Sequence, residues 1–130
     1  MNITVQGVTF SYRSTPSLIN VSLELQESEV LGLIGPNGSG KTTLLKCINR
    51  ILEPKQGRIM LGEKEIKKMS RLEVAKHIGY VPQTSSGNPN ALPVFEIVLM
   101  GRRPHIAWQS SEKDNTKVWA ALKILDIEHL

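Results

Sequence analysis

The sequence has few cysteines, no excess of glycine or proline, and no long apolar run. It has one cysteine, ten glycines and seven prolines among 130 residues, and no apolar run of the roughly 18 residues that a membrane span needs. A lone Cys47 cannot form an internal disulfide or a Cys-x-x-Cys site, which favours a reducing compartment and a small buried side chain. We expect one folded domain rather than a disordered or collagen-like chain.

A strong excess of one charge is missing as well. Sixteen Lys and Arg residues against twelve Asp and Glu residues leave a formal net charge of +4, and the basic residues are scattered along the chain. Such a surface tolerates an anionic partner such as a nucleotide, but it is not the clustered basic face typical of nucleic-acid-binding proteins. Residues 1–6 contain no cationic segment ahead of an apolar core, so we expect no secretory signal. The chain should be soluble or peripheral to a membrane.

Apolar patterning predicts several strands. Residues 3–10 and 21–25 alternate apolar and polar side chains, which predicts an antiparallel pair of half-buried strands. Residues 30–34 (VLGLI) form a continuous apolar run, which is typical of a strand buried on both faces of a parallel sheet. Residues 57–66 predict a short hairpin, and residues 78–81 predict another short strand.

Helical spacing and capping signals predict four helices. The expected starts are Thr42, Arg71, Val94 and about Glu112. Ser70 and Glu73 have capping-box spacing ahead of the second of these helices. The apolar stripe of the last helix is Val118, Leu122 and Leu125. The first helix must end before Pro54, and residues 84–93 between the second and third helices read as a polar loop. The predicted fold class is therefore α/β, with mostly parallel core strands beside an antiparallel edge hairpin.

Residues 35–42 (GPNGSGKT) match the pattern G-x-x-x-x-G-K-[ST] and lie between the predicted strand at 30–34 and a predicted helix. Small residues let successive backbone N–H groups turn inward and form a concave nest of donors for phosphate oxygens. The helix N-terminus that follows adds unpaired N–H groups and a positive dipole end. Lys41 supplies a full positive charge for the β- and γ-phosphates. The sequence therefore predicts a phosphate-binding loop.

The two threonines after Lys41 have distinct predicted roles. Thr42 offers a hydroxyl suited to Mg²⁺, which otherwise keeps waters and phosphate oxygens, and Thr43 is placed to donate to a nearer phosphate. The loop residues predicted to hold the nucleotide with them are Gly35, Asn37, Gly38, Ser39, Gly40 and Lys41.

Three segments appear in order: residues 8–12 (VTFSY), residues 30–45 with the phosphate loop, and residues 78–83 (IGYVPQ). Together they resemble the N-terminal part of an ABC transporter ATP-binding subunit, over essentially the whole chain. The resemblance implies a P-loop NTPase core to about residue 83 and the start of a helical subdomain at about 84–130. It implies ATP and Mg²⁺ as ligands, transmembrane permease subunits and a second ATP-binding subunit as partners, and a cytoplasmic place on the inner face of the cell membrane.

The resemblance also implies roles outside the loop. Tyr12 matches the aromatic residue that stacks on adenine in the family; the alternative is an ordinary strand tyrosine. Gln83 matches the Q-loop glutamine, which reaches the metal or the attacking water; the alternative is an ordinary loop residue. Residues 93–105 resemble a stretch of importers for iron-siderophore, haem and cobalamin, near the groove for a membrane-subunit helix. The alternative is a surface helix followed by a basic turn.

Three catalytic elements of the family have no match in the sequence: a signature loop, an acidic strand ending in Asp-Glu, and a later switch histidine. Residues 85–88 come too early for the signature loop, and residues 124–128 continue a helical stripe. His77, His105 and His129 have no metal-ligand spacing. The chain thus resembles a domain truncated before its signature and Walker B half. Whether it is an enzyme stays open between a transporter ATPase subunit and a non-catalytic nucleotide-binding fragment, and the early hairpin argues against a small P-loop kinase.

Overall fold

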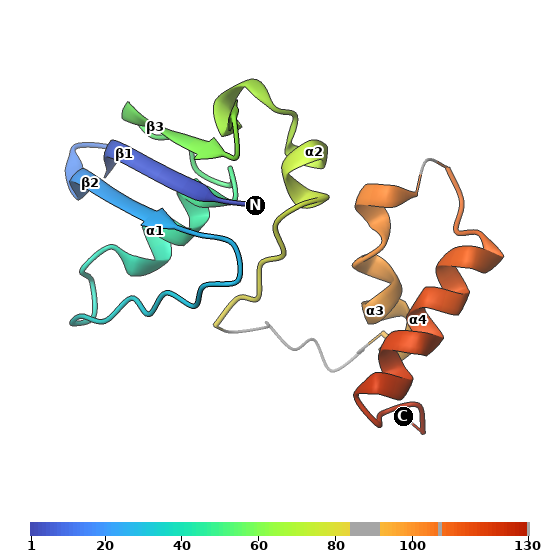
Figure 1. The fold of residues 1–130 in the computed structure, drawn as a ribbon. Helices are drawn as coiled ribbons and strands as arrows, with labels where there is room; N and C mark the ends of the chain where they lie inside the picture. Colours follow the sequence, from blue (N-terminus) through green and yellow to red (C-terminus); the bar gives the residue numbers. More distant parts are fainter. Residues whose placement is uncertain (84–91, 107, 130) are drawn as a thin grey trace. The chain divides into compact units, whose positions relative to one another are not determined.

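A computed structural model describes residues 1–83, 92–106 and 108–129 (Figure 1). The chain divides into two compact units, Met1–Tyr80 and Val81–Leu130. Most of the predicted polar loop at 84–93, including residues 85–88, lies outside the described residues. The identification of the two parts as a nucleotide-binding core and the start of a helical subdomain stays a prediction.

The first unit is built on a four-stranded antiparallel sheet in the order β2-β1-β3-β4. Its strands are β1 (Ile3–Tyr12), β2 (Thr15–Leu25), β3 (Gln56–Leu61) and β4 (Lys64–Glu65). The predicted early antiparallel pair is confirmed, since Ile3 lies opposite Leu25 and Val8 opposite Val21, and the pairing extends beyond the predicted strands to Tyr12 and Thr15. The predicted hairpin is confirmed as β3 and β4, where Leu61 pairs with Lys64.

A bulge in β1 lets two valines face the same core. In a regular strand, residues three positions apart point to opposite faces. The pairing with β2 shifts register between Val5 and Val8, and Gly7 between them has a φ angle of 59°. This bulge resets the alternation, so Val5 is 1% exposed and Val8 is 0% exposed. The alternation predicted for residues 3–10 is therefore interrupted at Gly7.

One face of this sheet is covered by α1 (Lys41–Ile48), and η1 (Ile66–Lys68) and α2 (Arg71–Ala75) contribute to the same core (Figure 1). The predicted capping box of α2 is confirmed: Ser70 Oγ accepts from the N–H of Glu73 at 3.1 Å, and Glu73 Oε2 accepts from the N–H of Ser70 at 2.6 Å. The buried core residues are Val5, Val8, Phe10, Leu18, Leu44, Cys47, Ile59, Leu61, Ile66, Met69 and Val74.

Cys47 has the structural role that the sequence predicts. It lies on α1, is 1% exposed and is a free thiol. Burial raises the pKa of this thiol to about 11, because the low-dielectric core disfavours the thiolate. Cys47 therefore packs as a small apolar side chain.

Two predicted strands do not form in the described part of the chain. Residues 30–34 and 78–81 have no strand pairing there, and the sheet contains no parallel pair, so the prediction of mostly parallel core strands is wrong for these residues. Val30 and Ile34 are each 99% exposed. A strand needs a neighbour for its N–H and C=O groups, and none of the four strands of this sheet pairs with either segment. An apolar pattern predicts a strand, but it does not say which other segment will form hydrogen bonds with it.

The second unit contains α3 (Val94–Met100), η2 (Arg103–His105) and α4 (Glu112–Ile124). Both α-helices agree with the predicted ones. Val118 and Leu122 of α4 are buried, whereas Leu125, the last residue of the predicted stripe, follows the helix and is exposed. Phe95 of α3 packs against Trp119 of α4, with ring centroids 5.2 Å apart. Within residues 1–83, 92–106 and 108–129, no helix has the length and apolar content to cross a bilayer.

Candidate functional site: the phosphate loop

The predicted phosphate loop joins residues 30–34 to the N-terminus of α1. In that segment Val30 and Ile34 are exposed, while Leu33 is partly buried and packs against the core. Gly38 and Gly40 have φ angles of 82° and 91°, in the left-handed region that favours glycine, whereas Ser39 between them does not have a positive φ. Alternation of this kind turns successive N–H groups toward one side and forms an anion-binding nest. The loop therefore has the backbone conformation expected for binding phosphate.

The first turn of α1 carries no side-chain cap of its own. Its N-cap residue is Gly40, and no acidic residue lies in the first turn. The first N–H groups of a helix lack intrahelical acceptors and carry partial positive charge. Because no side chain of α1 neutralises them, an anionic ligand would be a favourable acceptor for these groups.

Gly40 lies where β2 closely approaches the loop and leaves no room for a side chain. A Cβ atom on Gly40 would lie 2.5 Å from the carbonyl oxygen of Ser17 and 2.9 Å from Cδ2 of Leu18. A Cβ atom on Gly38 would meet nothing within 4 Å. The hairpin strand therefore fixes the place where the loop becomes helix.

Lys41 spans the loop with its side chain. Its Nζ atom donates to the carbonyl oxygens of Gly35 and Pro36, at 2.8 Å each, and to Ser39 Oγ at 3.4 Å. An ammonium group has three N–H donors, so two are engaged at short distance and the third only at long distance. A phosphate oxygen is a charged and therefore stronger acceptor than the Ser39 hydroxyl. The third donor is thus the one available to a ligand.

Open space lies beside this ammonium group. A cavity of about 320 Å³ adjoins the loop, so the loop is not folded shut around Lys41. Its lining residues are Leu18, Val21, Leu33, Ile34, Gly35, Pro36, Ser39, Gly40, Lys41 and Leu44.

Tyr12 lies at the end of β1, close to the first turn of α1. Its ring meets that of Phe10 edge-on, with centroids 4.9 Å apart, and the residue is 48% exposed. Its hydroxyl is 3.5 Å from Oγ1 of Thr43, and Ser17 Oγ donates to the same Oγ1 at 3.0 Å. The structure therefore brings the predicted adenine-stacking residue together with the phosphate loop. Ser17 is a functional candidate that sequence reasoning missed, because no local pattern links it to a residue 26 positions away.

Thr42 and Asn37 are exposed, as ligand-facing residues can be. Mg²⁺ prefers oxygen ligands and keeps several waters, so one hydroxyl combined with nucleotide oxygens is a suitable ligand set. Within the described residues, no three His, Cys, Asp or Glu side chains cluster so that they could hold a metal. The exposed Thr42 hydroxyl fits a Mg²⁺ ion that also takes nucleotide oxygens as ligands.

Gln83 is exposed and belongs to the unit Val81–Leu130, whereas Thr42 belongs to the first unit. Gln83 and the phosphate loop therefore belong to different units of the structure. Its role at the metal or the attacking water stays a prediction.

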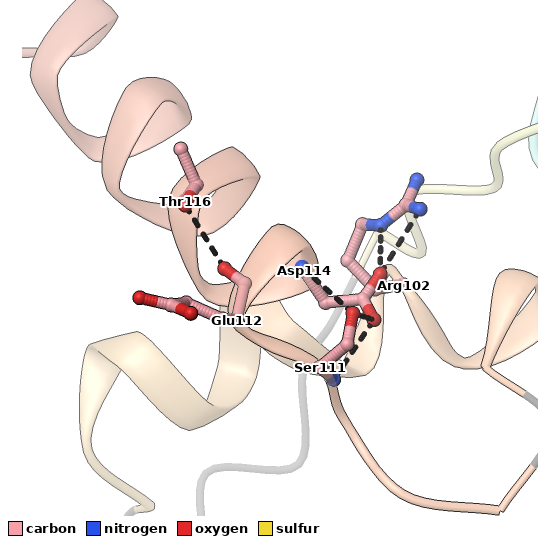
Figure 2. Close-up of polar contacts among 5 residues, drawn as sticks. All are labelled: Arg102, Ser111, Glu112, Asp114 and Thr116. Atoms are coloured by element: carbon pink, nitrogen blue, oxygen red, sulfur yellow. Dashed lines mark hydrogen bonds and ion pairs between the residues drawn. The ribbon is translucent and has the colours of Figure 1, made fainter.

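A second polar cluster, within the second unit, surrounds Asp114 (Figure 2). Both Nε and Nη2 of Arg102 lie 3.1 Å from Oδ1 of Asp114, while the N–H and the hydroxyl of Ser111 donate to Oδ2 at 3.1 and 2.7 Å. The hydrogen bonds from Ser111 first, and Arg102 next, lower the pKa of Asp114 to about 2. Arg102 of the predicted basic turn is therefore paired. The spacing of Ser111 and Asp114 is the capping-box signal that sequence reasoning overlooked.

The predicted permease-facing segment borders a groove in the second unit. The groove has a volume of about 440 Å³. Its lining residues are Leu92, Glu96, Leu99, Met100, Arg103, Ile106, Trp108, Gln109 and Ser110. It combines exposed apolar side chains with the guanidinium of Arg103.

Comparison with known proteins shows which family the chain belongs to. The family model described as ABC transporter matches residues 18–130. An uncharacterised ABC transporter ATP-binding protein of Methanocaldococcus jannaschii is 46% identical over 128 residues, which are 98% of this chain and 50% of that protein. The petrobactin import ATP-binding protein FpuC of Bacillus anthracis is 34% identical over 97% of this chain and 47% of its own length. The chain thus spans about half the length of these curated relatives.

Solved structures show the same fold. A transporter described as of the metal-chelate type, in an inward-facing conformation, matches 98% of this chain and 46% of its own with 32% identity and a TM-score of 0.78. A nucleotide-free ATP-binding cassette from an ABC transporter matches the whole chain and 56% of its own with 25% identity and a TM-score of 0.82. The predicted α/β class with an antiparallel hairpin is confirmed, and the chain belongs to the ABC transporter ATP-binding family.

Proposed function

We propose that this chain binds ATP with Mg²⁺ through the phosphate loop and, within an intact subunit, couples ATP binding and hydrolysis to import. The observation that carries this proposal is the geometry at Lys41: its ammonium group spans the loop beside open space, ahead of a helix N-terminus without a side-chain cap. An anion of high charge, such as a triphosphate, is the ligand that these groups would stabilise most.

The residues divide the task between them. The N–H groups from Gly38 to Lys41 and the Lys41 ammonium group would hold the phosphates, while Thr42 would complete the ligand set of Mg²⁺. Tyr12 presents a half-exposed ring next to the same helix, which supports its proposed role in stacking on adenine. Bound Mg²⁺ would supply charge neutralisation between the phosphate oxygens.

The names of the relatives support a proposal for the cargo class and the partners. Proteins named for the import of petrobactin and hemin and for the transport of achromobactin match 87–97% of this chain, at 34–38% identity. We propose an iron-siderophore, haem or cobalamin type of importer, with permease subunits and a second ATP-binding subunit as partners on the inner face of the membrane. The apolar groove beside α3 supports this by offering a surface for a permease helix.

Binding of MgADP to the purified chain and to Lys41→Ala tests the proposal. We expect the variant to bind at least tenfold more weakly, because it loses hydrogen bonds from a charged donor to phosphate. Lys46→Ala is the matched control, since it removes a positive charge from the last turn of the same helix. Titration calorimetry on all three proteins gives the affinities. Equal affinities in the chain and Lys41→Ala would contradict the proposal.

Hydrolysis is a separate question with its own measurement. ATP turnover by this chain that disappears in Lys41→Ala would favour the ATPase subunit over the alternative of a non-catalytic nucleotide-binding fragment. Nucleotide binding without turnover would favour that alternative.

A further inference from the structure

The hydroxyl of Ser17 links β2 to the first turn of α1. Ser17 Oγ donates to Oγ1 of Thr43 at 3.0 Å, and Thr43 is 6% exposed. We infer that Ser17 is a positioning residue, which directs the Thr43 hydroxyl proton toward a phosphate oxygen of the bound nucleotide. This inference rests on the proposed function.

The direction of the proton follows from a count of donors and acceptors. A threonine hydroxyl has one proton and two lone pairs. Ser17 donates to one lone pair, so the Thr43 proton must point to another acceptor. Of the residues that the structure describes, the other side-chain neighbour is the Tyr12 hydroxyl at 3.5 Å, the outer limit of a hydrogen bond. The proton is therefore weakly engaged, and a charged phosphate oxygen would be a better acceptor.

The backbone of the same residue also acts on the loop. The carbonyl oxygen of Ser17 closes the space beside Gly40, where an added Cβ would approach it to 2.5 Å. Ser17 therefore contacts the loop just before α1 through its main chain and contacts Thr43, the third residue of α1, through its side chain. A residue that fixes both the loop and a hydroxyl in the first turn is well placed to set the geometry of a phosphate contact.

The competing explanation is that the bond between Ser17 and Thr43 only ties β2 to α1. A purely structural tie would change stability and leave ligand affinity alone. A positioning role would change nucleotide affinity through Thr43, so the effects of the two residues on affinity would not be independent.

The experiment measures MgADP affinity by calorimetry and the urea unfolding midpoint in a double-mutant cycle. The variants are Ser17→Ala, Thr43→Val and the double variant, with Ser17→Thr as the rescue that keeps a hydroxyl. Ser14→Ala, an exposed serine in the turn of the same hairpin, is the control. We expect Ser17→Ala to weaken binding about fivefold and Thr43→Val about tenfold. The double variant should bind no more weakly than Thr43→Val, and Ser17→Thr should bind as the unaltered chain does.

Two results would overturn the inference while leaving the proposed function intact. One is a Ser17→Ala variant with a lower unfolding midpoint but unchanged MgADP affinity. The other is a double variant whose loss of affinity is the product of the two single losses. If the chain and Lys41→Ala bind MgADP equally poorly, the proposed function fails and this inference fails with it.

Discussion

Gly40 meets two requirements at a single residue. Its φ angle of 91° lies where a Cβ atom is disfavoured, and the space where that atom would be is filled by the Ser17 carbonyl. A left-handed φ costs a non-glycine residue about 1–2 kcal/mol, and the overlap with a strand backbone adds to this cost. We expect Gly40→Ala to lower the free energy of unfolding by more than about 2 kcal/mol and to abolish MgADP binding. Urea denaturation followed by circular dichroism measures the first effect, and calorimetry the second.

Gly38 provides the matched control for this prediction. It has a similar φ angle, 82°, but a Cβ atom there would meet nothing within 4 Å. Gly38→Ala should therefore cost only the unfavourable φ angle, about 1–2 kcal/mol. Equal losses of stability in the two variants would show that β2 does not approach Gly40 closely enough to exclude a Cβ atom.

At this scale the sequence predicts the loop well and its neighbours poorly. The loop residues are specified by a short motif, because each position serves the local backbone or the ligand directly. Ser17 lies outside the strands that the sequence predicts, at 3–10 and 21–25, and its contact with Thr43 exists only after the hairpin and α1 have packed together. The ion pair between Arg102 and Asp114 likewise forms only when separate elements pack together.

At the scale of elements, the N-terminus of α4 depends on an ionised Asp114. Its pKa in the folded chain is about 2, below its ordinary value of 3.8, because Ser111 and Arg102 bond to the carboxylate. Between these two pH values the unfolded chain binds the proton more readily than the folded chain does. The stability from this group is therefore complete above about pH 4 and is lost as the pH falls through about 2. We expect the second unit to unfold more easily across this range.

Tryptophan fluorescence measures this effect selectively, because Trp108 and Trp119 are the two tryptophans of the chain and both lie in the second unit. Urea unfolding is followed by tryptophan emission at several values between pH 2 and 5. Asp114→Asn is the control: it lowers stability at pH 5 and flattens the change with pH over this range. The same pH dependence in Asp114→Asn and in the unaltered chain would assign the effect to other carboxyl groups.

Elements with local signals are predicted correctly, and elements that need a distant partner are not. The capping box at Ser70 and the turn between β3 and β4 involve neighbours within a few residues, and both are confirmed. Residues 30–34 and 78–81 carry the pattern of buried strands, but a strand is completed by hydrogen bonds from another segment. Those bonds do not form within the described residues, so the pattern alone overpredicts strands.

At the scale of the whole molecule, some apolar side chains are buried in the core and others are exposed to solvent. Val30 and Ile34 are each 99% exposed, while Val8 is 0% exposed. We expect the double variant Val30→Ser and Ile34→Ser to change the free energy of unfolding by less than about 0.5 kcal/mol, because no contact is lost. Val8→Ala should cost about 2 kcal/mol, from lost burial and the cavity left behind. Urea denaturation compares the two, and a double variant as unstable as Val8→Ala would show that Val30 and Ile34 pack in solution.

The rate at which Cys47 reacts with an alkylating reagent reports on opening of the core of the first unit. The chain holds one thiol, and it is both shielded from solvent and held in its unreactive protonated form at neutral pH. An alkylating reagent can modify it only during moments when the core around α1 opens, so the rate of alkylation reports how often that happens. Cys47 lies on the helix that begins at the phosphate loop, so a ligand bound to the loop would lower the rate of alkylation. The alkylation rate then measures ligand binding without any label on the protein.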